Sequence, residues 1–182
     1  MKTESNARYI ARLAITLLLI TAVVAALLAA VNSVTAPRIE ALNAQKTQQA
    51  IEAVLPGGGE QVTDTDDTGL VGTVYKGSAG YAVEVMPNGF NGAVTMMVGV
   101  DLNGQVLGIS IVNHTETAGL GAVAAAQTTA GNAFRSQFVG MSGNVSVKKD
   151  GGQVDALTGA TITSRAVCTG VNAALQAAAA LG

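Results

Sequence analysis

An uncharged apolar segment near the start of the chain constrains the fold more than any other feature. No charged residue occurs between Arg12 and Arg38, and residues 13–31 consist mostly of Leu, Ile, Val and Ala. As an α-helix these 19 residues extend about 29 Å, close to the hydrocarbon thickness of a bilayer. The sequence therefore predicts a helix that crosses a membrane once.

A cleavable signal peptide is the alternative interpretation of this segment. Lys2, Arg8 and Arg12 precede it, and Val34-Thr35-Ala36 resembles a small-residue cleavage site. The apolar part of a signal peptide is usually about 7–15 residues long, so the greater length here favours a retained anchor. Because basic flanks stay in the cytoplasm, we expect a cytoplasmic N-terminus in the cell inner or plasma membrane, with the rest of the chain extracytoplasmic.

The length of 182 residues leaves room for one moderate domain beyond the anchor. We expect the cytoplasmic N-terminus and anchor over residues 1–36, a helical stalk or linker over 37–60, and the domain over 61–182. After residue 36 there are seven Lys and Arg residues against eleven Asp and Glu, a formal charge of −4 without a basic cluster. This composition argues against nucleic acid as a partner. One His and one Cys are too few for a His/Cys metal site, and Cys168 is interpreted as a small buried side chain.

Short aliphatic segments separated by turn residues predict a meander of about four antiparallel strands. The stretch over residues 60–69 is polar and is interpreted as a solvated loop. The expected strands cover residues 70–76, 81–86, 93–101 and 105–113; two short helices follow over 122–127 and 131–138, then strands over 145–148 and 153–157 and a helix over about 165–181. An antiparallel sheet flanked by helices places the domain in the α+β class.

A sequence rich in Thr and Gly before the last expected helix is the main candidate for a binding site. It reads Asp155-Ala156-Leu157-Thr158-Gly159-Ala160-Thr161. Gly159 and Ala160 leave the backbone uncrowded, and a helix that begins near Ser164 would direct free N–H groups at an anion. A phosphate-bearing ligand is one interpretation, and an ordinary turn with a helix cap is the other.

The same string resembles the flavinylation motif of the FMN-binding domain family, D-x-x-[ST]-G-A-T. In that family the last Thr, here Thr161, is esterified to the phosphate of FMN, which implies a covalent cofactor. The segment from Glu116 to Gly121 is similar to the family's E-[ST]-P-G-L-G sequence beside the flavin, although Ala118 replaces the usual Pro. The resemblance implies the following flavin neighbours: Glu116, Thr117, Gly119, Leu120 and Gly121.

Several side chains near the motif are candidates for contact with the phosphate. The hydroxyls of Thr158 and Thr163 and the ammonium of Lys148 are expected beside it, whereas Lys149 is interpreted as solvated. Asp155 either presents or activates Thr161 during attachment or braces the turn, and both alternatives stay open. His114 is interpreted as a polar loop residue, and no catalytic residue is expected.

The resemblance is strongest to the G subunits of Rnf electron-transport complexes, and it extends to the C subunit of sodium-pumping NADH:quinone reductase. It implies an electron-transfer subunit of an ion-translocating ferredoxin:NAD⁺ oxidoreductase, with membrane and iron–sulfur subunits as partners and a flavin transferase for maturation. The chain has no cysteine cluster, no G-x-G-x-x-G sequence and one span, so it is not expected to be catalytic alone. Two alternatives remain: an anchored FMN protein that serves another extracytoplasmic reductase, and a non-catalytic anchored binding or assembly module.

Overall fold

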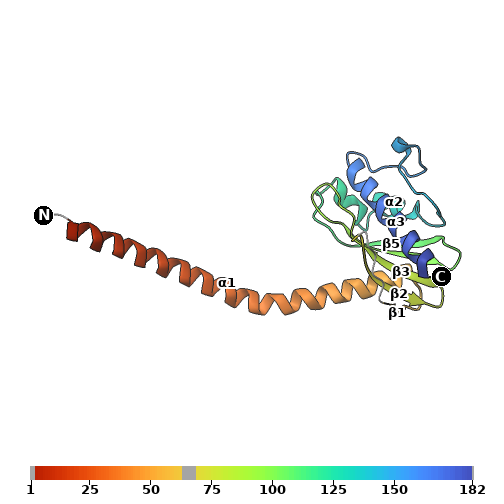
Figure 1. Ribbon diagram of the computed structural model, residues 1–182. Coiled ribbons are helices and arrows are strands. Elements are labelled where there is room, and N and C mark those ends of the chain that lie inside the picture. Colours follow the sequence, from red (N-terminus) through yellow and green to blue (C-terminus); the bar gives the residue numbers. More distant parts are fainter. Residues whose placement is uncertain (1–2, 63–68, 182) are drawn as a thin grey trace. The chain divides into compact units, whose positions relative to one another are not determined.

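The computed structural model describes residues 3–62 and 69–181 (Figure 1). The chain divides into two units, one up to Ala44 and the other from Gln45. The described elements are α1 (Thr3–Val54), β1 (Glu60–Val62), β2 (Val71–Gly77), β3 (Gly80–Val85), β4 (Thr95–Asp101), β5 (Val106–Asn113), the 3₁₀ helix η1 (Gly121–Ala124), α2 (Thr129–Ser136), the 3₁₀ helix η2 (Lys148–Asp150) and α3 (Thr161–Leu181). The predicted α+β class is confirmed.

The predicted anchor is part of one uninterrupted helix, α1, which is long and apolar enough to cross a membrane. Hydroxyl groups within it donate to carbonyls of the preceding turn, as Thr16 does to Arg12 and Thr35 to Val31. A polar side chain that is satisfied by its own helix can enter the bilayer at low cost. Pro37 lies inside α1, so the anchor and the first part of the expected stalk, up to Val54, form one continuous helix.

The last turns of α1 belong to the second unit. Ile51, Val54 and Leu55 are buried and pack with Ala82 and Met97 of the sheet. A β-carbon on Gly99 of β4 would overlap the carbonyl of Val54, so the absence of a side chain there lets the helix approach the strand. The compact unit therefore begins at Gln45, inside the segment that the sequence assigned to a stalk.

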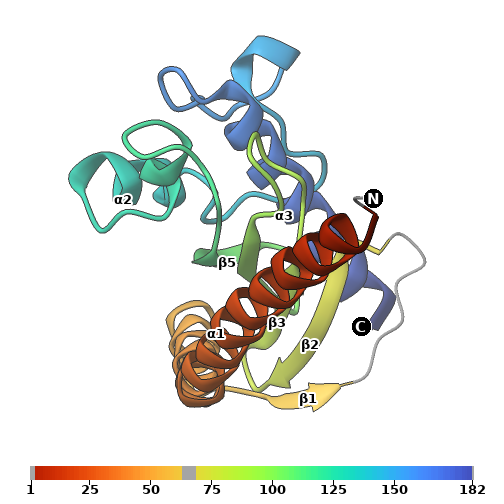
Figure 2. The same ribbon diagram turned by 90° about the vertical axis from the view of Figure 1, so that its left-hand side faces the viewer.

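The sheet is an antiparallel meander in the order β1-β2-β3-β4-β5 (Figure 2). Its last four strands confirm the four that alternation and turn residues predicted. Strand β1 was not predicted: Gln61 pairs with Tyr75 of β2, in a stretch interpreted as a loop. The rest of that stretch, residues 63–68, lies outside the described residues.

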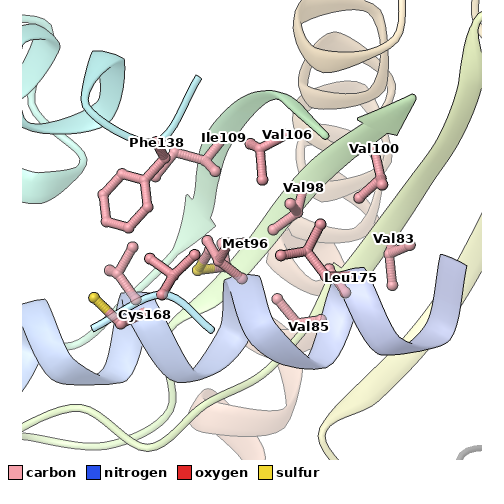
Figure 3. Packing of buried hydrophobic residues seen from close by; sticks show 14 of the residues in the cluster. Val83, Val85, Met96, Val98, Val100, Val106, Ile109, Phe138, Cys168 and Leu175 are labelled. Atoms are coloured by element: carbon pink, nitrogen blue, oxygen red, sulfur yellow. The ribbon is translucent and has the colours of Figure 1, made fainter. Parts of the chain in front are cut away.

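Helix α3 covers the other face of the sheet and encloses the main core. Figure 3 shows Val85, Met96 and Val98 of the sheet facing Leu175 of α3. Strand β4 is thus buried on both faces, with Met96 toward α3 and Met97 toward the end of α1. Burial on both faces explains why this strand is almost continuously apolar.

Two predictions about the segment between β5 and α3 are wrong. The strands expected over residues 145–148 and 153–157 are reduced to a single parallel bridge between Val147 and Val154. The backbone N–H groups of Asp150 and Gly152 both donate to the Val147 carbonyl, so this segment closes into the tight turn η2 and the pairing does not extend beyond the bridge. The helix expected over residues 122–127 is the short η1, whereas the helix expected over 131–138 is confirmed as α2.

The start of α3 also differs from the prediction. The helix begins at Thr161, about one turn before the expected residue, because the Ala160 carbonyl already accepts from the Ser164 N–H at 3.0 Å. This places Thr161 in the first helical turn.

Candidate functional site

Three segments of the domain converge around the start of α3. They are the β3–β4 loop, the segment after β5 and the end of the Thr/Gly-rich sequence. Together with Lys149 of η2, they enclose a cavity of about 350 Å³, a size typical of small-molecule sites. Its lining residues are Phe90, Glu116, Thr117, Leu120, Gly121, Lys149, Gly159, Ala160, Thr161, Ile162 and Thr163. The two sequence motifs, distant along the chain, therefore meet at one cavity.

The first turn of α3 presents unpaired donors at this cavity. Gly159 adopts a left-handed φ of 74°, and the Ala160 N–H donates to the Leu157 carbonyl at 3.0 Å, which turns the chain into the helix. Within the described residues, no acceptor pairs with the backbone N–H groups of Thr161, Ile162 and Thr163. Unpaired N–H groups and the positive end of the helix dipole favour an anion at this position.

Glu116 lies in the wall of the cavity and is 8% exposed. Its Oε1 accepts from the N–H groups of Phe90 at 2.8 Å and Asn91 at 3.0 Å, and its Oε2 accepts from the Thr163 hydroxyl at 2.5 Å. Burial by itself raises the pKa of this carboxyl. The three donors and the nearby His114 outweigh burial, so the pKa of Glu116 lies below its ordinary value.

Two glycines make room for this carboxylate. A β-carbon on Gly121 would overlap both Glu116 Oε2 and the Thr163 hydroxyl, and one on Gly89 would overlap Glu116 Oε1. Gly119 is different, because no atom lies within 4 Å of a β-carbon there but its φ is 76°. In the segment from Glu116 to Gly121, Gly121 is therefore needed for close packing and Gly119 for its backbone conformation.

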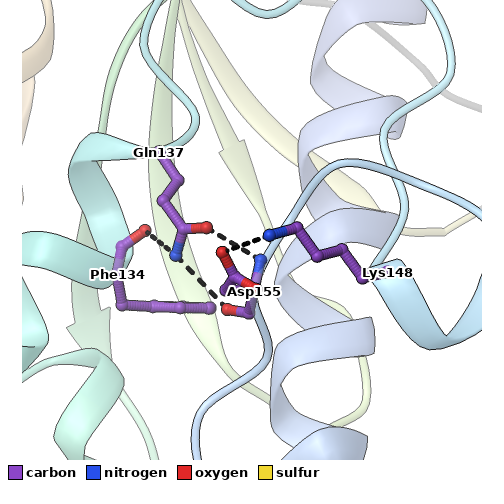
Figure 4. A network of polar contacts seen from close by, with 4 residues as sticks. All are labelled: Phe134, Gln137, Lys148 and Asp155. Atoms are coloured by element: carbon purple, nitrogen blue, oxygen red, sulfur yellow. Dashed lines mark hydrogen bonds and ion pairs between the residues drawn. The ribbon is translucent and has the colours of Figure 1, made fainter.

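Asp155 and Lys148 lie outside the cavity lining. Figure 4 shows Lys148 directed at Asp155, with Nζ 2.7 Å from Oδ2, in a network with Gln137. The Gln137 side chain accepts from the Asp155 N–H at 2.8 Å and donates to the Asp155 carbonyl at 3.3 Å. These contacts brace the sequence that leads to Thr161, and they support the bracing alternative for Asp155.

The structure brings most of the other expected site residues together. Ala160 is buried in the lining and Thr161 is half-buried, whereas Thr158 is exposed and outside it. Lys149, interpreted as solvated, is the lysine that lines the cavity. His114 accepts from the Glu116 N–H through Nδ1 at 3.2 Å, as a loop residue.

Two apolar lining residues were missed in the sequence. Phe90 is 63% exposed and Ile162 is 49% exposed, and together with Leu120, 44% exposed, they surround the cavity with apolar surface. Phe90 could have been recognised in the sequence as an aromatic residue between Gly89 and Asn91, because turn residues favour exposure of the side chain between them. We call Phe90, Leu120 and Ile162 the apolar mouth.

Comparison with known proteins gives matches over nearly the whole chain. Residues 89–176 match the FMN-binding domain, and residues 1–54 match the RnfG N-terminal region. The G subunit of the ion-translocating oxidoreductase complex of Methanosarcina acetivorans is 33% identical over 94% of this chain and 96% of its own length. This chain belongs to the family of Rnf G subunits.

Other G subunits give the same result. The G subunit of the Na⁺-translocating ferredoxin:NAD⁺ oxidoreductase complex of Acetobacterium woodii is 31% identical, over 96% of this chain and 94% of its own length. The G subunit of the ion-translocating oxidoreductase complex of Pseudomonas aeruginosa is 40% identical over 50% of this chain and 44% of its own length. The FMN-binding match spans the cavity from the Phe90 loop to α3, and the N-terminal match covers α1.

The residues at the cavity fit FMN as a ligand of this Rnf G subunit. The unpaired N–H groups of the first helical turn and the Lys149 ammonium suit a phosphate, and the apolar mouth suits a planar ring. Among the described residues, no group of His, Cys, Asp and Glu side chains has the arrangement of a metal site.

Proposed function

We propose that this protein is the electron-transfer subunit of a membrane-bound Rnf-type ferredoxin:NAD⁺ oxidoreductase, and that FMN is esterified through its phosphate to the Thr161 hydroxyl. The observation that carries the proposal is the position of Thr161. It is the first residue of α3, it lines the cavity, and it belongs to the turn whose N–H groups have no acceptor among the described residues.

The protein's contribution is attachment, orientation and electrostatics. FMN, when bound, supplies a ring that accepts one or two electrons. The N–H groups of Thr161, Ile162 and Thr163 would hold the phosphate oxygens, and the Lys149 ammonium would offset their charge. Relatives of this chain are named as subunits of complexes, so the electron donor and acceptor are proposed to be other membrane and iron–sulfur subunits.

Attachment of FMN requires a separate flavin transferase, because an unperturbed Thr hydroxyl is a weak nucleophile. With FAD as the donor and Mg²⁺ as the metal of the transferase, the Thr161 oxygen forms the new bond to the FMN phosphorus. The bond between the two phosphates of FAD breaks, AMP leaves, and the hydroxyl proton passes to a base or to water. A covalent tether prevents loss of the cofactor on the extracytoplasmic side.

The test is intact-mass analysis combined with flavin fluorescence of the denatured protein, after coexpression with a flavin transferase. Wild type is expected to gain the mass of FMN less one water and to fluoresce, and Thr161→Ala to do neither. Thr169→Ala is the matched control, because Thr169 lies on the same helix and is exposed, and its hydroxyl donates to the backbone carbonyl of Arg165. A folded wild type that stays unmodified would reject the proposal in favour of a non-catalytic binding or assembly module.

The genes that neighbour the gene of this protein distinguish the Rnf-type complex from the remaining redox alternative. A flavinylated protein encoded beside multi-span and iron–sulfur subunits supports the Rnf-type complex. A flavinylated protein without such neighbours would instead support an anchored FMN protein that serves another extracytoplasmic reductase.

A further inference from the structure

Glu116 is the one charged side chain that is buried among the described residues. A buried charge is costly unless it is paired or well hydrogen-bonded. Neither ion pair of the described residues includes Glu116; the charge is satisfied by two backbone N–H groups and one hydroxyl. A carboxylate held in this way can join separate parts of the chain, which an apolar side chain could not do.

The three donors come from two parts of the chain that are distant in sequence. Phe90 and Asn91 belong to the β3–β4 loop, and Thr163 belongs to the first turn of α3, two residues after Thr161. The loop is closed on itself by two hydrogen bonds, from the Gly89 N–H to the Gly92 carbonyl and from the Val94 N–H to the Pro87 carbonyl. These bonds brace the loop, and the Glu116 carboxylate joins it to α3.

Besides this carboxylate, two hydrogen bonds join the loop to the segment after β5: the Thr115 hydroxyl donates to the Asn91 carbonyl at 2.9 Å, and the Asn91 side-chain amide donates to the Thr117 hydroxyl at 3.5 Å. Asn91, Thr115 and Thr117 are all exposed, so both bonds are open to competition from water. Of these contacts, those of Glu116 are buried, and they are the ones that extend to the first turn of α3.

We propose that Glu116 is a positioning residue for the flavin: by joining the β3–β4 loop to the first turn of α3, it holds the apolar mouth against the isoalloxazine ring. This inference rests on the proposed attachment of FMN to Thr161. The ring is the occupant of the mouth because Ile162 directly follows the attachment residue, and Phe90 and Leu120 line the same cavity.

The experiment compares three variants of the full-length protein in detergent, each coexpressed with the flavin transferase. Glu116→Gln replaces an acceptor oxygen by an amide donor, and Thr163→Val removes one donor at nearly constant volume. Asp101→Asn is the matched control, because Asp101 also accepts from two backbone N–H groups, of Asn103 at 2.9 Å and Gln105 at 2.7 Å, but at the other end of β4.

The readout is quenching of flavin fluorescence by acrylamide, well below the melting temperature. Acrylamide is neutral, so the loss of the Glu116 charge does not itself change its access to the ring. Loss of a hydrogen bond to a charged group changes the open population of a loop about tenfold or more. We therefore expect the quenching constant to rise severalfold in Glu116→Gln, to rise less in Thr163→Val and to stay at the wild-type value in Asp101→Asn.

The outcomes separate this inference from the proposed function. Loaded Glu116→Gln and Thr163→Val proteins with wild-type quenching would overturn the inference and leave the attachment of FMN intact. A wild type that is not flavinylated would overturn both. If Glu116→Gln does not fold, the Thr163→Val variant provides the test. A quenching constant for Thr163→Val equal to that of Asp101→Asn would reject the positioning role of Glu116.

Discussion

The buried carboxylate of Glu116 makes the stability of the domain depend on pH. Its pKa is lowered in the folded protein, so its contribution to stability is complete above the unfolded pKa, about 4.3, and is lost as the pH falls through the folded pKa. We expect the melting temperature of flavin-free wild type to exceed that of Glu116→Gln at pH 7, and the difference to narrow below about pH 4.

Melting curves of both proteins between about pH 3 and pH 7 test this prediction. Glu52→Gln is the control, because Glu52 is exposed on α1. The difference in melting temperature between Glu52→Gln and wild type is expected to stay constant across this pH range. A constant difference between wild type and Glu116→Gln over the whole range would contradict the prediction.

Gly121 is required by close packing with Glu116 and Thr163. Gly121→Ala forces the two side chains apart, and overpacking of this kind typically costs about 1–3 kcal/mol. Gly108→Ala is the control, since the nearest atom to its β-carbon, on Val54, is 3.9 Å away. Urea unfolding followed by tyrosine fluorescence should show a lower midpoint for Gly121→Ala alone. Equal midpoints for the two variants would show that the cavity wall adapts without cost.

The residue pattern predicted Thr161 at the site, but it placed Lys148 beside the phosphate and Lys149 in solvent, whereas Lys149 is the lysine that lines the cavity. Both lysines are exposed, and which of them faces the cavity depends on the backbone of η2. Phe90 was missed for a related reason. Its place in the lining depends on the contact of a distant loop with Glu116, and local sequence does not encode that contact.

At the scale of the element, the end of α1 supplies part of the domain core. Ile51 is 2% exposed and packs on the sheet, whereas Leu42, on the same helix, is 56% exposed. We expect Ile51→Ala to lower the free energy of unfolding by about 2–5 kcal/mol. Leu42→Ala should change it by less than about 0.5 kcal/mol. Urea unfolding of the two variants measures the difference, and similar small losses would show that the domain folds without this helix end.

Elements with a strong local pattern were predicted well, and elements that depend on long-range contacts were not. Alternating aliphatic residues and Gly-rich turns located β2 to β5, because adjacent antiparallel strands need only short connections. The segment between Val145 and Leu157 has similar aliphatic residues. Its backbone nevertheless forms a turn, because N–H groups of following residues donate to the Val147 carbonyl. The short β1 carried no apolar pattern, because it is an edge strand with mostly exposed residues.

At the scale of the whole molecule, the chain combines an apolar helix that can span a membrane with a domain that can hold a flavin. The basic residues before the helix favour a cytoplasmic N-terminus, which would place the domain on the opposite side. The chain offers a clean way to test this orientation, because Cys168 is its single cysteine and is buried. Burial, with a smaller contribution from Asp150, raises the pKa of the Cys168 thiol to about 11, so little of the reactive thiolate forms near neutral pH.

Introduced cysteines should therefore report the side of the membrane on which each part lies. We expect Ser78→Cys, at an exposed turn between β2 and β3, to react in intact cells with a maleimide that cannot cross the membrane. Ser5→Cys, before the apolar segment, should react only after the cells are permeabilised, and wild type should not react in either case. The opposite pattern for the two variants would place the domain in the cytoplasm, where a covalent tether would not be needed to keep FMN from being lost.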